Sequence, residues 1–211
     1  MKTHADIYSN FYVHVLLHYR WGIVIHGGID GHSRVITFLH ASCNNRASTV
    51  LTLFQSATQR FGVPSRVRTD HGGENMDVAT FMEEYRGRGR GSILQGRSVH
   101  NQRIERLWRA VRSGAVGLFH NLFHSLEEDQ RIQIDNPSHL WALHFVFLPR
   151  INRALADFVG QWNNHHLRTE GHRTPLQIFA RDAIRNCNSS LTAMSDLFRA
   201  RGRNEPAPST S

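Results

Sequence analysis

The chain has 211 residues, enough for one α/β domain, and its 40% hydrophobic and 20% charged residues indicate a globular and not a disordered chain. Its net charge of +8 favours a polyanionic partner such as nucleic acid, although a basic protein without such a partner can carry the same charge. Cys43 and Cys187 predict no disulfide framework, and the sequence predicts neither a signal peptide nor a membrane anchor.

The first part of the chain predicts three strands followed by a helix. Residues 21–28 and 35–41 are rich in β-branched and apolar residues, and the Asp-Gly-His-Ser turn signal at 30–33 lies between them, so they predict an antiparallel hairpin. Residues 11–17 predict a further strand before this hairpin. Residues 46–61 change to a helical period and predict an amphipathic helix.

A shorter strand, helix and strand follow. Gly-Val-Pro at 62–64 ends the first helix, and 66–68 predicts a short basic strand. Residues 76–85 predict a helix, which the glycine-rich segment 87–91 breaks. Residues 92–94 predict another short strand. This order of elements is typical of a layered α/β domain.

The second part of the chain is predicted to be mostly helical. Helices are expected over residues 99–126, with interruptions, and over 139–162, where Pro149 predicts a kink or a division. Thr174-Pro175 fits an N-cap followed by proline at the first helical position, which opens a helix over 175–185. Residues 201–211 are rich in Pro, Ser, Gly and Arg and predict a disordered tail.

Several apolar residues in these helices are spaced for burial. Helical spacing places Ile104, Leu107, Trp108 and Val111 on one face. The same spacing predicts that the aromatic residues belong to the core and do not form platforms for stacked bases; these are Trp108, Phe119, Phe123 and Phe145.

Asp70 is a candidate ligand for a catalytic metal ion. It follows the strand predicted at 66–68 and begins the sequence Asp-His-Gly-Gly-Glu-Asn, whose glycines leave space beside the carboxylate. Enzymes that cleave or join phosphodiesters commonly use two divalent cations, and Mg²⁺ and Mn²⁺ prefer carboxylate oxygens. The alternative is a polar turn residue after a strand, a common place for aspartate.

Glu105 is the second candidate and lies 35 positions after Asp70. On a helix, Asn101 and Glu105 are four residues apart and share a face, and arginines flank them. A carboxylate in this setting can bind a metal ion beside a phosphate backbone. The alternative is an exposed helix acid that pairs with a neighbouring arginine.

Basic residues near these two acids are candidates for contacts with nucleic acid. Arginine binds phosphates without reading base sequence, whereas the alternative for the Arg-Gly run at 86–91 is a solvated loop. The candidate residues for nucleic-acid binding are Arg68, Arg86, Arg88, Arg90, Asn101, Arg103, Arg106 and Arg109.

With these motifs in place, the chain resembles the integrase catalytic core family, also called DDE or DD35E, and most closely the vertebrate transposon-derived integrase core domain proteins. Asp70 with its glycines resembles the second acid of such cores, and Glu105 resembles the third. Residues 23–34 resemble two strands of that fold, and 162–175 resemble its closing segment. The resemblance covers about Arg20 to Phe179. It implies an RNase H-like fold, an α/β mixed sheet flanked by helices with a C-terminal helical extension.

The first acid of the family has no clear counterpart. By the resemblance its position falls on Val13, and no acid lies between Asp6 and Asp30. Asp30 fits the turn after the second strand better than a metal ligand. We therefore divide the chain into an atypical or truncated start at 1–19, an integrase core at 20–185 and a tail at 186–211.

The resemblance implies DNA integration by metal-dependent transesterification, with Mg²⁺ or Mn²⁺ bound by Asp70 and Glu105. It also implies DNA as partner, self-association and nuclear localisation. One alternative is a catalytically decayed or domesticated core that binds nucleic acid or protein, since the first metal-ligand aspartate is missing. Another alternative is an RNase H-like nuclease unrelated to transposition, which the spacing of the two acids and Asn101 disfavour.

Overall fold

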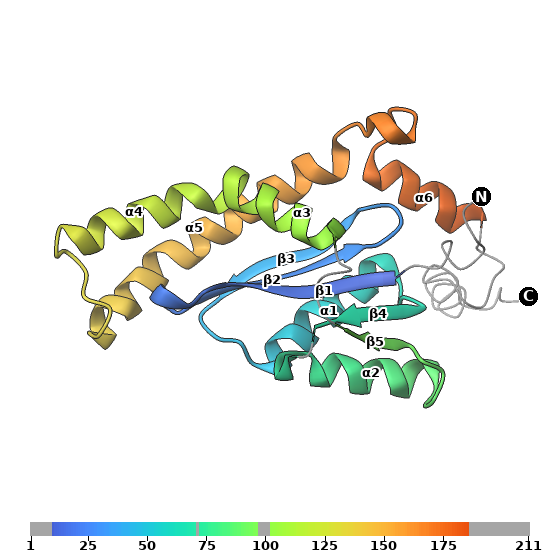
Figure 1. The fold of residues 1–211 in the computed structure, drawn as a ribbon, viewed down its shortest axis with the longest axis horizontal. Coiled ribbons are helices and arrows are strands. Elements are labelled where there is room, and N and C mark those ends of the chain that lie inside the picture. Colours follow the sequence, from blue (N-terminus) through green and yellow to red (C-terminus); the bar gives the residue numbers. More distant parts are fainter. Residues whose placement is uncertain (1–9, 71, 97–101, 186–211) are drawn as a thin grey trace, which may run out of the picture.

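The computed structural model describes residues 10–70, 72–96 and 102–185, and five strands form its central sheet (Figure 1). These are β1 (Asn10–His18), β2 (Ile23–Asp30), β3 (Ile36–Ser42), β4 (Arg66–Thr69) and β5 (Ile93–Gln95). They lie in the order β3-β2-β1-β4-β5. β2 is antiparallel to both β1 and β3, whereas β4 is parallel to both β1 and β5, so the predicted mixed sheet and hairpin are confirmed.

Six α-helices are described. They are α1 (Ala47–Phe61), α2 (Met76–Arg86), α3 (Gln102–Val111), α4 (Gly117–Glu128), α5 (Pro137–Asn164) and α6 (Pro175–Arg185). A π-helical stretch at Arg112–Val116 joins α3 to α4 and is the interruption predicted between 99 and 126. Residues 97–101, where the sequence predicts the start of this helical region, lie outside the described residues. The reciprocal hydrogen bonds between Thr174 and Gln177 confirm the predicted N-cap of α6.

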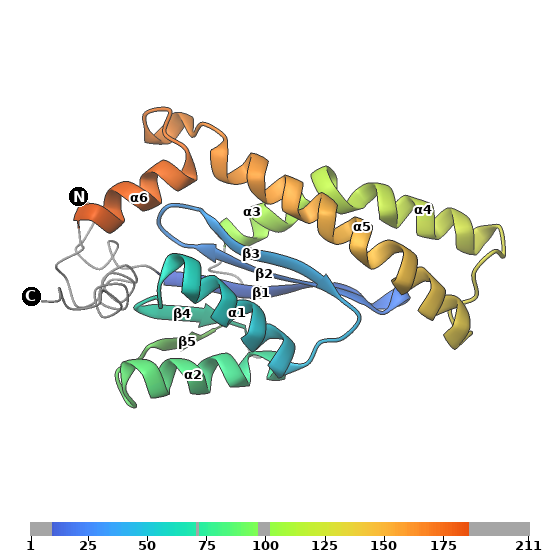
Figure 2. The same cartoon turned by 180° about the vertical axis from the view of Figure 1, so that it is seen from behind.

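Helices cover both faces of the sheet, as the two opposite views show (Figures 1 and 2). On one face, here called the α1/α2 face, the strands pack against α1 and α2 through the buried residues Phe11, Val13, Val50, Phe54, Val67, Val78 and Met82. On the other, the α3/α5 face, they pack against α3, α4 and α5 through Ile23, Ile25, Ile104, Leu107, Trp108, Phe123, Leu143 and Ile151. Because β2 is covered on both faces, all of its residues are buried.

The structure corrects two expectations about α5. Of the two outcomes predicted at Pro149, a kink or a division, the division does not occur, because Pro149 lies inside one continuous helix. Proline removes the hydrogen bond to the carbonyl of residue 145, but both positions are exposed, so water can satisfy that carbonyl, while Leu143 and Ile151 anchor the helix on either side. Phe145 is not a core residue. It is 69% exposed and stacks on Trp141, because the buried face of α5 follows Leu143, Ile151 and Leu155.

The sheet begins at Asn10, ten residues before the start that the sequence predicts for the core. Cys43 is a free, exposed thiol, and Cys187 lies outside the described residues. Within the described part of the chain, no helix combines the length and apolar character needed to cross a membrane.

Candidate functional site

Asp70 follows β4 directly and takes part in a compact turn. The side-chain nitrogen of Asn75 donates to Asp70 Oδ1 at 2.8 Å and lies 3.5 Å from a carboxylate oxygen of Glu74. A side chain at Gly72 would collide with the Glu74 carboxylate, 2.0 Å from the added carbon, so glycine leaves room for this arrangement. An amide donor therefore lies between two carboxylates of the Asp-His-Gly-Gly-Glu-Asn motif.

Glu105 lies in the first turn of α3 and is exposed. The predicted apolar face of this helix is confirmed, since Ile104, Leu107, Trp108 and Val111 are buried. Gly27 of β2 makes this packing possible: a β-carbon there would lie 2.7 Å from the Trp108 ring. With that face against the sheet, Glu105 projects away from the core. Among the described residues it makes no ion pair, so the expected alternative of a pair with a neighbouring arginine is not seen there.

Glu105 lines a groove of about 860 Å³ between α3 and the connection from α5 to α6. Arg106 and Arg109 stand with it on the α3 side. The β2–β3 turn contributes Ile29 and Arg34, and the α5–α6 connection contributes Trp162, His165, His166, Leu167, Arg168 and Thr169. Four arginines and one carboxylate therefore line the groove, which gives it a positive electrostatic field.

The wall of the groove formed by the α5–α6 connection is fixed to the sheet by hydrogen bonds. Asn163, near the end of α5, accepts a hydrogen bond from Ile36 N at 2.8 Å and donates to Ile36 O at 3.1 Å. Trp162 Nε1 donates to the carbonyl of Arg34 at 2.9 Å. Because β3 lies at the edge of the sheet, the backbone groups of Ile36 would otherwise bond to water, and the Asn163 side chain takes their place as partner. These bonds hold the α5–α6 connection opposite α3.

The predicted nucleic-acid contacts divide into two groups. Arg106 and Arg109 line the groove, as expected of a binding surface. Arg86 and Arg90 instead donate to the backbone carbonyls of residues 63–65, which fastens the Arg-Gly run to the connection between α1 and β4. Arg88 is exposed in that loop.

Arg68, Asn101 and Arg103 are the remaining predicted contacts. Arg68 lies on β4 with its guanidinium beside Gly96, and it does not line the groove. Asn101 and the side chain of Arg103 lie outside the described part of the chain.

Sequence reasoning missed the four other basic residues of the groove. Arg34, His165, His166 and Arg168 were not proposed as ligand contacts, although Arg168 lies in the closing segment that carries part of the resemblance. No short-range spacing relates Arg34 to α3, because the two meet only when the hairpin and the helix pack together.

By the resemblance, the position of the family's first acid falls on Val13, and the structure shows which face of the sheet this residue occupies. Val13 is 1% exposed and packs with Phe11 and Val67 on the α1/α2 face, so its side chain points away from α3. The neighbouring residue Tyr12 packs on the α3/α5 face, in register with Arg68 of β4. Of these two neighbouring residues, the one whose side chain faces α3 is therefore a tyrosine.

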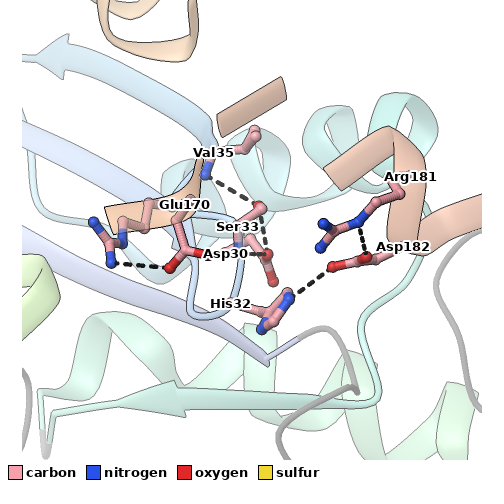
Figure 3. A network of polar contacts seen from close by, with 8 residues as sticks. Asp30, His32, Ser33, Val35, Glu170, Arg181 and Asp182 are labelled. Atoms are coloured by element: carbon pink, nitrogen blue, oxygen red, sulfur yellow. Dashed lines mark hydrogen bonds and ion pairs between the residues drawn. The ribbon is translucent and has the colours of Figure 1, made fainter. Parts of the chain in front are cut away.

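Asp30 has the turn-forming role predicted for it. Its carboxylate accepts hydrogen bonds from Ser33 N at 2.7 Å and Ser33 Oγ at 2.6 Å (Figure 3). Its backbone carbonyl accepts a hydrogen bond from Arg34 N. Burial raises the pKa of Asp30, while the hydrogen bonds from Ser33 oppose that change. The carboxylate is buried at 2% exposure and belongs to the turn, not to a metal site.

The described residues do not fit a two-metal site. No group of three His, Cys, Asp or Glu side chains within them converges on one point. Asp70 does not line the groove that contains Glu105, and its carboxylate is already bonded to the Asn75 amide. Two cations at about 3.5–4 Å separation need several converging carboxylates to hold them.

Comparison with known proteins shows which family the sequence matches. A family model described as "Integrase core domain" matches residues 11–193. No curated protein sequence matches the chain.

Several solved structures share the fold. The catalytic core of BIV integrase is 12% identical, with a TM-score of 0.56, over 82% of this chain and 94% of that one. The catalytic core of HTLV-2 integrase, solved with magnesium, is 15% identical, with a TM-score of 0.50, over 81% of this chain and 95% of that one. A chain of the simian T-cell lymphotropic virus intasome, in complex with a PP2A regulatory subunit, is 13% identical, with a TM-score of 0.54; the match spans 81% of this chain and 54% of that one.

Proposed function

Because this chain belongs to the integrase core domain family, a family of DNA integration domains, we propose that it binds DNA through the groove beside Glu105. The observation that carries the proposal is the convergence of Arg34, Arg106, Arg109 and Arg168 on one groove. DNA carries a negative charge for every ~1.7 Å of helix axis and holds a layer of counterions. Arginines that bind its phosphates release these counterions, and the release stabilises the complex.

The ligand chemistry favours the phosphate backbone over the bases. Guanidinium groups bind phosphate oxygens in a bidentate geometry, and such contacts position a protein on DNA without reading its sequence. Trp162 does not offer a free stacking surface, because its ring already packs on Phe158 and His165 and its Nε1 is bonded to Arg34. We therefore expect binding that depends strongly on salt and weakly on sequence.

The test is the affinity of the whole chain for a fluorescent DNA duplex at several salt concentrations. Replacing both Arg106 and Arg109 by alanine is expected to weaken binding by roughly tenfold or more. The salt slope, which is the steepness with which the logarithm of the binding constant falls with the logarithm of the salt concentration, should decrease by about 2. The matched control is Arg60→Ala in the last turn of α1, on the opposite face of the sheet. Equal losses in the control and in the double variant would refute the assignment of the groove.

Metal-dependent strand transfer is the second candidate, supported by the exposed carboxylate of Glu105 in the groove and by the integrase-like context of Asp70. Against it stand the Tyr12 side chain on the α3/α5 face of β1 and the poor fit of the described residues to a two-metal site. We therefore favour DNA binding without strand transfer, the activity of a catalytically decayed core.

A nicking and strand-transfer assay with Mn²⁺ decides between the two candidates. The unaltered chain and Glu105→Gln are expected to give the same background signal. Robust activity of the unaltered chain that Glu105→Gln abolishes would establish the enzyme and refute the decayed core.

Self-association and nuclear localisation follow from the same proposal. The HTLV-2 core is described in dimeric and trimeric forms, so we expect this chain to self-associate, which light scattering after size-exclusion chromatography measures. A DNA-binding role implies residence in the nucleus, which microscopy of the tagged chain tests.

A further inference from the structure

Arg34 has a backbone conformation that side chains rarely adopt. Its φ angle is +68°, in the left-handed region that glycine, asparagine and aspartate tolerate best. It ends the turn between β2 and β3, where glycine would be free of this strain. Strained residues persist where the surrounding structure imposes the conformation, and they cluster at ligand sites.

The surroundings do impose this conformation. The backbone nitrogen of Arg34 donates to Asp30 O at 2.9 Å, and its carbonyl accepts from Trp162 Nε1 at 2.9 Å. The turn is also tied to α6, because His32 Nε2 lies 2.7 Å from Asp182, which Arg181 contacts in turn (Figure 3). The guanidinium of Arg34 is therefore delivered to the groove by a turn that is anchored on two sides.

Glu170 lies beside this guanidinium (Figure 3). An Arg34 nitrogen and a Glu170 oxygen are 3.6 Å apart, which is an ion pair longer than a hydrogen bond, and both side chains are 28% exposed. A carboxylate and a phosphate offer the same kind of oxygen to a guanidinium. The Glu170 carboxylate therefore contacts the Arg34 guanidinium where a DNA phosphate could also bind.

The rest of this wall offers cationic or polar groups in fixed positions. Leu167 and Arg173 form a β-bridge that closes the connection between α5 and α6, and Arg168 lies exposed within it. The Nδ1 atoms of His165 and His166 each contact a backbone carbonyl, so they carry hydrogen and leave Nε2 for other partners.

We propose that Arg34 and Arg168 form a second phosphate-binding wall opposite α3, and that Glu170 occupies Arg34 until a DNA phosphate replaces it. This inference rests on the proposed DNA-binding function. It assigns the groove two walls, so that a DNA backbone is held between Arg106 and Arg109 on one side and Arg34 and Arg168 on the other. Glu170 then acts as an internal competitor that lowers affinity for DNA.

The experiment measures duplex-DNA affinity and its salt slope for the full chain and four variants. Arg34→Gly removes the guanidinium and relieves the left-handed strain, so the fold is retained while affinity falls about five- to tenfold and the salt slope falls by about 1. Arg34→Asn, which also tolerates this conformation, should give the same loss and replaces the glycine variant if that one is unstable.

The opposite sign is expected for Glu170→Gln, which should raise affinity about three- to fivefold, since Arg34 is released. Its matched control is Asp129→Asn, which removes the same charge from an Arg–carboxylate pair that does not line the groove and should leave affinity unchanged. Unchanged binding of both Arg34 variants, or equal effects of the Glu170 and Asp129 variants, would overturn the proposal.

The outcome for α3 separates this inference from the proposed function. If Arg106→Ala with Arg109→Ala weakens binding and the Arg34 variants do not, DNA lies along α3 alone and only the second wall is wrong. If neither set weakens binding, the groove is not the DNA site and both proposals fail.

Discussion

The two faces of the central sheet differ in what they leave accessible. The α1/α2 face is closed by apolar side chains such as Phe54 and Met82, which are fully buried. The α3/α5 face is apolar beneath Trp108, but beyond it α3 and the α5–α6 connection leave a groove lined by arginines and Glu105. The ligand-binding chemistry of this chain is therefore concentrated on one face.

This difference shows why a shift of one residue along a strand matters. Successive side chains of a strand point to opposite faces, so neighbours on β1 have unrelated surroundings. Val13 belongs to the closed face, whereas Tyr12 belongs to the face that carries the groove. Of these two positions, that of Tyr12 is the one from which a carboxylate could face α3.

The largest expected effect is therefore that of Val13→Asp. It places a carboxylate among apolar side chains at a site that is 1% exposed, and we expect the free energy of unfolding to fall by roughly 3–5 kcal/mol. Urea denaturation measures the loss. Tyr12→Asp, on a half-buried position, should cost clearly less. Equal costs, or Mn²⁺-dependent nicking restored by Val13→Asp, would contradict the assignment of the two residues to opposite faces.

A medium effect is expected for Gly27→Ala, which tests the contact that seats α3. The added carbon would lie 2.7 Å from the Trp108 ring, so overpacking should cost about 1–3 kcal/mol and should weaken DNA binding by displacing α3. Gly160→Ala in α5 is the matched control. It meets nothing within 4 Å and should stabilise the chain by about 0.5–1 kcal/mol through its helix propensity. A neutral Gly27→Ala would show that α3 does not depend on this close approach.

The smallest effect concerns two aspartates around the β2–β3 turn whose pKa values move in opposite directions. Burial raises the pKa of Asp182, but the hydrogen bond from Arg181 and the charge of His32 outweigh it, so the net pKa is lowered from 3.8. The stabilisation from Asp182 is present above its unfolded pKa and is lost as the pH falls through the folded pKa. For Asp30, whose pKa burial raises, the contribution is present below the unfolded pKa and is lost as the pH rises through the folded pKa.

Replacing each by asparagine should reveal this contrast in urea denaturation between about pH 3 and about pH 7. Asp182→Asn should lose about 0.5–1 kcal/mol near neutral pH, and this deficit should shrink as the pH falls. Asp30→Asn should instead gain relative to the unaltered chain as the pH rises. Parallel pH dependences of the two variants would show that the environments of the two carboxylates do not differ as described.

Much of the architecture could be predicted from local sequence. The turn signal at 30–33, the change of period at residue 46 and the Thr174-Pro175 cap each act over a few residues, and all three elements formed where expected. The same holds for the apolar face of α3, because a helix that buries one stripe must repeat it every three or four residues. These patterns, with the spacing of Asp70 and Glu105, were sufficient to identify the family.

Only the tertiary structure decided the rest. Alternation along β1 defines two faces, but the layer that covers each face depends on packing by distant helices, so the orientations of Val13 and Tyr12 could not be read from the chain. The groove joins residues from the β2–β3 turn, α3 and the α5–α6 connection, which are more than a hundred positions apart at the extremes. No spacing of residues along the chain predicts these contacts, since they form when separate elements bury their apolar faces against the same sheet.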